Sequence, residues 1–491
     1  MTATLSDRSS HVRAVAALTA SYAAIEEGTP VRLAKRTSNL FRPRADQAPA
    51  GLDVSGLDGV LAVDPIARTA DVQGMCTYER LVAECLRHGL MPKVVPQLKT
   101  ITLGGAVTGL GIESSSFRNG LPHESVLEMD VLTGDGRLLT VSPAQHPDLF
   151  HGFPNSYGSL GYAVRLLIEL DPVRGFVGLR NVRFTDLDDL AAAVGRITAE
   201  RSWDGEPVDF LDGVVFSSDQ AYLCLGSWVD SPAEAGVESA GDYTGQQIYY
   251  RSIVARERDC LAVSDYLWRW DTDWFWCSGA FGVQNPVIRR LWPARYRRSD
   301  FYHRLIWIDH RFKVAEKIDR IRRQPPRERV VQDVEIPLEQ TATFLRWFAG
   351  NVGMSPVWLC PLMLRDPAET ETETETETET ETEAAAGPDP AADQPAKPWP
   401  LYPLSPGQIY VNVGFWGTVP ITDGRSDGDV NRLIEAAVAK HAGHKSLYSD
   451  AYYDRQTFAA VYGGDVYAEL KDRYDPGHRL TGLYEKAVGR R

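Results

Sequence analysis

Cysteine, lysine and long apolar runs are scarce in this sequence of 491 residues. Six cysteines are too few for a disulfide-bonded scaffold and none forms a C-x-x-C pair, so we predict reduced thiols in a cytoplasmic protein. No apolar run approaches the roughly 20 residues that a membrane-spanning helix needs. Asp7, Arg8 and Arg13 interrupt the N-terminal segment, which argues against a signal peptide. His441 and His444 have no third ligand nearby in the sequence, so no metal site is predicted.

The charge balance excludes one class of partner. Lys and Arg together number 52 and Asp and Glu 66, so the net charge is −14. An alternating Glu/Thr strip, Glu369 to Glu383, holds eight of the acids, and the rest of the chain carries 52 − 58 = −6. A nucleic-acid binder needs surplus Lys and Arg to displace counterions, so we expect no nucleic-acid partner. The basic residues are 42 Arg and only 10 Lys, which indicates a GC-rich bacterial genome.

Changes in residue composition and hydrophobic periodicity divide the chain into five segments. Residues 1–29 contain a predicted amphipathic helix at 11–27, and residues 30–175 alternate short strands and turns with a few helices, which is typical of an α+β domain. Residues 176–366 mix helices and strands, residues 367–400 are a disordered acidic low-complexity insertion, and order resumes over 401–491. The specific predictions are strands at 69–74, 160–170, 207–216, 221–228 and 409–414, helices at 78–88, 186–200 and 338–349, and a hairpin of 124–133 with 137–141.

The segment from Thr102 to Ser116, Thr-Leu-Gly-Gly-Ala-Val-Thr-Gly-Leu-Gly-Ile-Glu-Ser-Ser-Ser, is the most informative. Glycine lets backbone N–H groups approach a ligand and adopts positive φ, and successive N–H groups form an anion-binding concavity. Hydroxyl groups add donors, so the segment fits a diphosphate. The alternative is a glycine-rich structural turn. The G-x-G-x-x-G dinucleotide fingerprint is absent, because Ser114 stands where its last glycine belongs.

Four further pieces flank this segment, one before it and three after it, and together they carry a resemblance. Pro96 precedes the glycines, Gly120-Leu-Pro-His-Glu-Ser-Val126 follows them, and Asp148-Leu-Phe and Gly158-x-x-Gly161 come next. The set is similar to the second lobe of the flavin-binding domain of the vanillyl-alcohol-oxidase type. The run Gly-Ile-Glu-Ser-Ser-Ser narrows the resemblance to the FAD-dependent 24-dehydrocholesterol reductase (Diminuto) family. Matches continue at Val330-Val-Gln-Asp, Trp358-Leu-Cys-Pro, Tyr410-Val-Asn-Val-Gly and Leu447-Tyr-Ser-Asp-Ala-Tyr.

The resemblance implies a fold and a cofactor site. The fold is α+β: a two-lobed PCMH-type FAD-binding domain, an α+β substrate (cap) domain and a C-terminal helical return segment. Lys35, Arg36, Thr37, Ser38 and Asn39 replace the usual R-G-x-G-x-S turn of the first lobe. No His or Cys stands at an attachment position, so FAD is expected to be noncovalent, with NADPH as electron donor. The other implied FAD-binding residues are Pro96, Thr102, Leu103, Gly104, Gly105, Ala106, Val107, Thr108, Gly109, Gly111, Ile112, Glu113, Ser114, Ser115, Ser116, Gly120, Val126, Gly158 and Gly161.

Reduction of an isolated C=C bond needs a positioned acid, a dry pocket and a π-rich wall that tolerates positive charge. The candidate catalytic residues are Tyr452, Asp450, Tyr448, Asp273 and Glu113, and each could instead be a buried structural group. The aromatic run from Tyr266 to Trp276 is either core or the wall of a substrate cavity. The arginines from Arg289 to Arg298 either form a solvated face or contact an anionic head group or the NADPH phosphate.

The resulting functional hypothesis is a reductase that converts the 10-methylene branch of a phospholipid acyl chain to a 10-methyl branch, as implied by the actinobacterial branch of the family. The expected partners are the lipid, a peripheral membrane contact and a methyltransferase that supplies the methylene lipid. The alternatives are a Δ24-sterol reductase, a sugar or alcohol oxidase on the same flavin fold, and a non-enzymatic flavoprotein.

Overall fold

The computed structural model describes residues 8–34, 41, 50–312, 317, 324–365, 397–422 and 424–488. The predicted phosphate turn Lys35 to Asn39 and the Glu/Thr strip lie outside these residues. Trp399 lies within them, is 7% exposed, and places its ring 4.5 Å from that of His123. The predicted disordered segment therefore extends too far at its C-terminal end, because an aromatic side chain there is buried.

The N-terminal part consists of helix α1 (Arg8–Ala23) and two short parallel strands, β1 (Val31–Leu33) and β2 (Ala50–Leu52). The predicted helix is present and buries Leu18 and Tyr22, but Val12 of its predicted apolar face is 63% exposed. It ends before the predicted residue 27, because Glu26 and Glu27 are unfavourable at the negative end of a helix dipole.

A six-stranded antiparallel sheet follows, in the order β3-β4-β8-β6-β7 with β5 paired to β8. Its strands are β3 (Val60–Asp64), β4 (Thr69–Gln73), β5 (Leu90–Pro92), β6 (Val126–Thr133), β7 (Leu138–Val141) and β8 (Gly161–Pro172). Short helices connect them: α2 (Tyr78–Cys85), η1 (Leu86–His88), α3 (Leu103–Thr108), α4 (Ser116–Asn119), η2 (Pro122–Ser125) and α5 (Pro147–Gly152). The predicted hairpin is confirmed as β6 and β7, and its turn glycine, Gly136, has φ of +86°.

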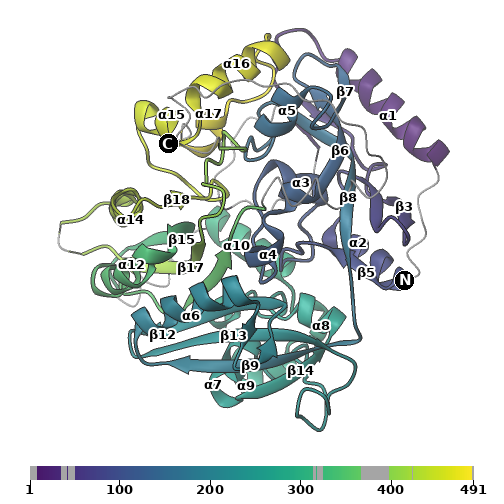
Figure 1. Cartoon of the computed structure of the whole chain (residues 1–491). Helices are drawn as coiled ribbons and strands as arrows, with labels where there is room; N and C mark the ends of the chain where they lie inside the picture. Colours follow the sequence, from purple (N-terminus) through teal and green to yellow (C-terminus); the bar gives the residue numbers. More distant parts are fainter. Residues whose placement is uncertain are drawn as a thin grey trace, which may run out of the picture.

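An eight-stranded antiparallel sheet forms the second half, in the order β14-β9-β13-β12-β16-β17-β15-β18. Its strands are β9 (Phe176–Phe184), β12 (Phe210–Ser217), β13 (Gln220–Val229), β14 (Arg258–Ala262), β15 (Arg327–Pro337), β16 (Val357–Leu362), β17 (Tyr410–Pro420) and β18 (His444–Lys445). Helices α6 (Leu187–Glu200), α12 (Leu338–Asn351) and α14 (Asp429–Lys440) cover one face (Figure 1). The opposite face shares a hydrophobic core with the six-stranded sheet. Any functional group on this second face is therefore held between the two sheets.

The aromatic-rich region and the C-terminus complete the molecule. The former contains α7 (Tyr249–Ala255), α8 (Val263–Leu267), η3 (Cys277–Phe281), α9 (Pro286–Leu291), η4 (Ala294–Tyr296) and α10 (Ser299–Phe312). The C-terminal helices are α15 (Arg455–Val461), α16 (Gly464–Tyr474) and α17 (Leu483–Ala487), and a two-strand ribbon joins β10 (Ser202–Trp203) to β11 (Glu206–Pro207). Helix α16 packs against α5 (Figure 1). The Lys471 ammonium donates to the Ser159 carbonyl, just before β8, at 2.7 Å.

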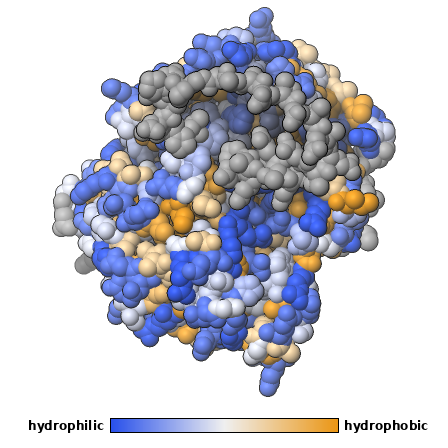
Figure 2. All heavy atoms as spheres, in the orientation of Figure 1, coloured by the Kyte–Doolittle hydropathy of each residue, from blue (hydrophilic) through white to orange (hydrophobic). Residues whose placement is uncertain are grey.

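The two sheets, their antiparallel pairing and the helices on their faces make this an α+β fold, as predicted. None of the helices in the described ranges is long and apolar enough to cross a bilayer. Figure 2 shows one face that is mainly hydrophilic, with apolar residues in small separate patches.

Candidate functional site

The glycine segment begins as a short helix that is packed against the six-stranded sheet. Thr102 caps α3, and its hydroxyl accepts a hydrogen bond from the Gly105 N–H at 3.3 Å. Gly104 is buried, and a Cβ there would lie 2.7 Å from the Gly74 carbonyl oxygen. Gly105 is exposed, and a Cβ there would contact only the Thr102 side chain within 4 Å. The two adjacent glycines therefore differ: Gly104 serves packing, and Gly105 leaves an open surface.

Beyond α3 the backbone offers unused hydrogen-bond donors. The N–H groups of Leu110, Gly111 and Ile112 donate to no acceptor in the described part of the chain, and Gly111 and Ile112 are buried. Buried backbone N–H groups almost always have a partner in a folded protein. A Cβ at Gly111 would lie 2.8 Å from Pro96 Cγ and 2.9 Å from Pro122 Cγ, so only glycine fits between these prolines. Three successive donors on a glycine-containing turn form the concavity that a diphosphate requires.

Left-handed backbone does not explain most of these glycines. Of the predicted flavin glycines, only Gly120 and Gly158 have positive φ, +67° and +72°. Gly104, Gly105, Gly109 and Gly111 do not, so the prediction that this segment needs left-handed backbone is wrong. Close packing explains Gly104, Gly109 and Gly111 instead, because each would place a Cβ less than 3 Å from a neighbouring atom.

The serine run also has a different role from the expected one. Ser114, Ser115 and Ser116 are at most 1% exposed. The Ser115 hydroxyl donates to the Lys93 carbonyl at 2.8 Å, and that of Ser116 accepts from the Glu113 N–H at 3.0 Å. The Ser115 and Ser116 hydroxyl groups therefore stabilise the turn that follows the unused N–H groups of residues 110–112. The other predicted positions, Leu103, Ala106, Val107, Thr108, Val126 and Gly161, lie in or beside α3, β6 and β8.

Glu113 joins the glycine segment to the second sheet. Its Oε1 lies 3.1 Å from Arg269 Nη2, which also lies 2.8 Å from Asp212 Oδ2 on β12. All three side chains are at most 3% exposed. Burial raises the pKa of Glu113, and the Arg269 guanidinium opposes this rise. The indole N–H groups of Trp270 and Trp358 also donate to Asp212, so the structure places Glu113 in a buried junction between the two halves.

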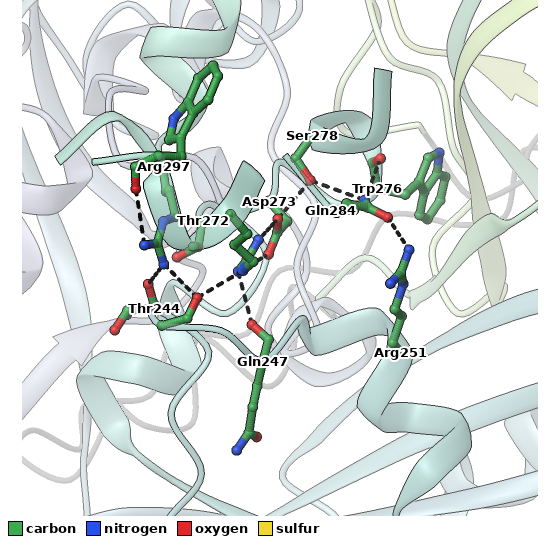
Figure 3. A network of polar contacts seen from close by, with 12 residues as sticks. Thr244, Gln247, Arg251, Thr272, Asp273, Trp276, Ser278, Gln284 and Arg297 are labelled. Atoms are coloured by element: carbon green, nitrogen blue, oxygen red, sulfur yellow. Dashed lines mark hydrogen bonds and ion pairs between the residues drawn. The ribbon is translucent and has the colours of Figure 1, made fainter. Parts of the chain in front are cut away.

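Asp273 lies in a second buried network, which Figure 3 shows. Both Asp273 oxygens accept from Arg289, at 2.6 and 2.9 Å. Ser278 donates to Asp273 Oδ1 at 2.7 Å (Figure 3). Arg289 is 1% exposed and Arg297 8%, and Arg297 donates to backbone carbonyls of residues 244 and 245. The predicted arginine face is therefore wrong for these two residues, because each is held inside the protein by its hydrogen bonds.

An aromatic cluster gathers side chains from four distant parts of the sequence. The Phe41 ring lies 4.7 Å from His303 on α10, 5.3 Å from Trp274 and 5.8 Å from Tyr448. Its other members, Phe275 and Trp276, face Trp416 of β17 at 4.3 and 5.4 Å. Phe41 follows the predicted phosphate turn of the first lobe and forms a β-bridge with Ser449. The cluster therefore joins the flavin-binding half, the Trp-rich run and the second sheet.

A carboxylic acid borders this cluster on β15. Side chains alternate along a strand, so Arg329, Asp333 and Glu335 point away from the covering helices. Asp333 faces Gly414 on β17, and a Cβ at Gly414 would lie 2.4 Å from Asp333 Oδ1, so glycine makes room for the carboxyl. Burial raises the pKa of Asp333 to about 7, and hydrogen bonds from Asn412 and Tyr448 oppose the rise.

Tyr448 is the predicted candidate that meets the aromatic cluster. Its hydroxyl accepts from Trp416 Nε1 at 2.9 Å and lies within hydrogen-bonding reach of Asp333. Burial raises the pKa of Tyr448 well above 10, so the phenol keeps its proton. Asp333, Trp416 and Tyr448 each keep partial exposure, so this pair is accessible.

Tyr452 and Asp450 lie on the same segment with other neighbours. The Tyr452 N–H donates to both Glu435 oxygens, at 3.0 and 3.1 Å, and Arg432 of α14 lies 5.1 Å from its ring. The Asp450 carbonyl accepts from Lys445 Nζ at 2.5 Å, and Lys445 pairs with Glu435 at 2.6 Å. The structure thus places Tyr452 against α14 and Tyr448 against the aromatic cluster.

Sequence reasoning missed Asp333 as a site residue, although its motif was noted. The strand Val330-Val-Gln-Asp-Val-Glu-Ile places two acids two residues apart in an apolar context. Two acids at this spacing share one face of a strand, which is unusual in a buried strand unless they have a partner or a function. This spacing of two acids in an apolar strand was the sequence signal that could have identified Asp333 as a site residue.

Comparison with known proteins agrees with the geometry of the glycine segment. Residues 11–142 match the family model described as FAD binding domain. They form an FAD-binding domain. Human Delta(24)-sterol reductase is 23% identical over 438 residues, covering 87% of this chain and 75% of that protein. The Arabidopsis thaliana Delta(24)-sterol reductase is 22% identical over 460 residues, covering 90% and 77%.

A rice protein, Cytokinin dehydrogenase 9, is 30% identical over 157 residues, covering 32% of this chain and 29% of its own length. The chain is thus similar over most of its length to proteins named Delta(24)-sterol reductase, and over a shorter stretch to one named Cytokinin dehydrogenase 9. The residues present also fit the cofactor: the unused N–H groups of 110–112 and the open surface at Gly105 would hold the FAD diphosphate.

We expect FAD to be held noncovalently. Cys277 is the half-buried cysteine, and burial raises the pKa of its thiol to about 12, which leaves almost no reactive thiolate. Acid precipitation of the purified yellow protein should release all the flavin into the supernatant, measured by absorbance. Colour retained in the pellet after washing in denaturant would contradict this expectation.

Proposed function

We propose that this protein is an FAD-dependent, NADPH-driven reductase of an isolated C=C bond in a lipid, with a methylene-branched fatty acyl chain of a phospholipid as substrate. The observation that carries the proposal is the accessible Tyr448–Asp333 pair, set against an aromatic cluster that adjoins the FAD-binding domain. Such a pair can deliver a proton where apolar carbon binds.

The overall reaction consumes one NADPH and one proton for each double bond reduced. NADPH gives two electrons and becomes NADP⁺, and the alkene gains a hydride on one carbon and a proton on the other. Reduced FAD, when bound, supplies the hydride from N5. The Tyr448 phenol donates its proton to the less substituted alkene carbon, and protonated Asp333 restores that proton. Trp274, Trp276 and Trp416 exclude water and stabilise positive charge on the other carbon through their π faces.

The branched acyl chain suits this arrangement because one carbon of its methylene bond bears two alkyl groups and can carry the cation. Supply of such a substrate requires a methyltransferase that adds one carbon to an unsaturated acyl chain. A Δ24-sterol is the second candidate, supported by the printed names of the relatives that cover most of the chain. The aromatic surroundings of Tyr448 disfavour the sugar oxidase alternative, which needs a polar pocket.

The test is a reduction in deuterated solvent. Given NADPH and FAD, the protein should saturate a 10-methylene-octadecanoyl phospholipid, with one deuteron from solvent in the product. With 4-deuterated NADPH in ordinary water, mass spectrometry should find the label at the adjacent carbon. Turnover of a Δ24-sterol with none of the methylene lipid would establish the second candidate, and turnover of neither alkene would overturn the proposal.

A further inference from the structure

Helix α9 exposes an apolar face that the fold does not use. Val287, Ile288 and Leu291 are 69%, 41% and 79% exposed, in a helix of six residues. Exposed apolar residues are normal when they are scattered, but three on two turns of one helix form a patch.

The helix is fixed firmly despite this exposure. Arg289 anchors it through two hydrogen bonds to Asp273 and further bonds to the Gly245 and Gln247 carbonyls, at 2.9 and 3.0 Å. Asn285 caps its first turn by accepting from the Val287 N–H at 3.0 Å. The apolar residues are thus presented outward by a rigid support.

The charge around this patch is unlike that of the rest of the chain. Residues 274–299 contain five arginines and no Asp or Glu, in a protein whose net charge is −14. Arg290 and Arg295 are exposed, and within the described residues neither forms an ion pair. Half-buried Trp292 lies between them in the sequence, and half-buried Tyr296 follows Arg295, whose guanidinium lies 4.8 Å from the Tyr296 ring. Aliphatic residues rimmed by arginine and ring side chains are typical of a surface that rests on anionic lipid.

The chain that follows the patch leads to the aromatic cluster. Helix α10 follows it in the sequence, carries exposed Ile308 at 42%, and places His303 4.7 Å from Trp274. The segment from α9 to α10 therefore connects the exposed patch along the chain with the cluster beside Tyr448.

We propose that Val287, Ile288 and Leu291, with Arg290 and Arg295, form a docking surface for an anionic phospholipid bilayer. Bilayer binding itself does not depend on the proposed function. Only its role does: it rests on the proposed function, in which lipid drawn from the bilayer would enter beside α10. Apolar side chains enter the boundary between head groups and acyl chains, and the two guanidinium groups bind lipid phosphates. The interaction is therefore expected to be reversible and to weaken as salt increases.

The test is flotation of the flavin-loaded protein with vesicles of phosphatidylglycerol and phosphatidylcholine in equal parts, or of phosphatidylcholine alone. The protein should float with the anionic vesicles at low salt and much less with the neutral ones. The double variant Val287→Glu and Leu291→Glu should bind the anionic vesicles roughly tenfold or more weakly. The matched control is Ile66→Glu, because Ile66 is 93% exposed on the other half of the protein. It should bind as the unchanged protein does.

Two further measurements separate this proposal from its rivals. The double variant should keep its flavin and its turnover of detergent-solubilised alkene, so loss of vesicle binding alone supports the docking surface even if the assumed substrate is wrong. Equal vesicle binding by the double variant, or none by the unchanged protein, would overturn the proposal. A change from dimer to monomer in sedimentation, with vesicle binding intact, would assign the patch to a second copy of the chain instead.

Discussion

Replacing Tyr448 with phenylalanine should slow the alkene-dependent reoxidation of the reduced enzyme by roughly 10²- to 10⁴-fold, the usual contribution of a general acid. The substitution removes the hydroxyl that accepts from Trp416 and reaches Asp333, but it keeps the ring that packs against Phe41. Flavin reduction by NADPH needs no proton from this phenol and should change by less than about twofold. Anaerobic stopped-flow absorbance measures both half-reactions.

The same segment supplies a matched control. Tyr452 is also a partly exposed phenol, and it has its backbone N–H on Glu435 and its ring beside Arg432 of α14. Tyr452→Phe should leave both half-reactions nearly unchanged. If Tyr452→Phe slows alkene reduction and Tyr448→Phe does not, the proton donor is Tyr452, and the Tyr448–Asp333 assignment is wrong. Equal slowing of both half-reactions by Tyr448→Phe would reduce that residue to a structural role.

The pH profile gives this prediction a second readout. Because the pKa of Asp333 is raised to about 7, its carboxyl carries a proton below pH 7 and loses it as the pH rises through that value. Alkene reduction should therefore fall above pH 7. Asp333→Asn cannot supply a proton, so it should be slower at low pH and lack this fall. An unchanged profile in Asp333→Asn would show that another group titrates.

Sequence patterns predicted the fold wherever one physical rule determined the outcome. The Gly134-Asp-Gly136 turn lies between two runs of strand-forming residues, and it became the β6–β7 hairpin. Tyr78 to His88 had helical periodicity and ended at Gly89, which has φ of +70° and ends the helical stretch of α2 and η1. Local turn and cap chemistry needs no knowledge of distant contacts.

The site was less predictable because its parts meet only through tertiary structure. Arg289 looked like a surface charge in the sequence, and its burial depends on Asp273, sixteen positions earlier in an aromatic run. The Tyr448–Asp333 pair joins residues more than a hundred positions apart, and the choice between Tyr448 and Tyr452 depends on which one faces β17. The exposed Gly105 and buried Gly104 are likewise identical in sequence and differ only in what covers them.

Gly105→Val should nearly abolish FAD binding, weakening it by roughly 100-fold or more. The added side chain occupies the open surface beside the Thr102 cap, where a Cβ lies 2.8 Å from Thr102 Oγ1, and so it blocks the approach of a diphosphate to the backbone donors. Loss of two charge-assisted hydrogen bonds, about 1.5–3 kcal/mol each, accounts for that factor. The matched control is Gly350→Val, since Gly350 is an exposed glycine of α12 whose Cβ would contact nothing within 4 Å. Both changes put valine in place of a helical glycine, so their effects on helix propensity are comparable. Bound FAD per protein, measured by absorbance, and titration of the flavin-free protein should separate the two variants. Full flavin occupancy in Gly105→Val, with a thermal unfolding midpoint like that of the control, would mean that the diphosphate lies elsewhere than on α3 and the donors of residues 110–112.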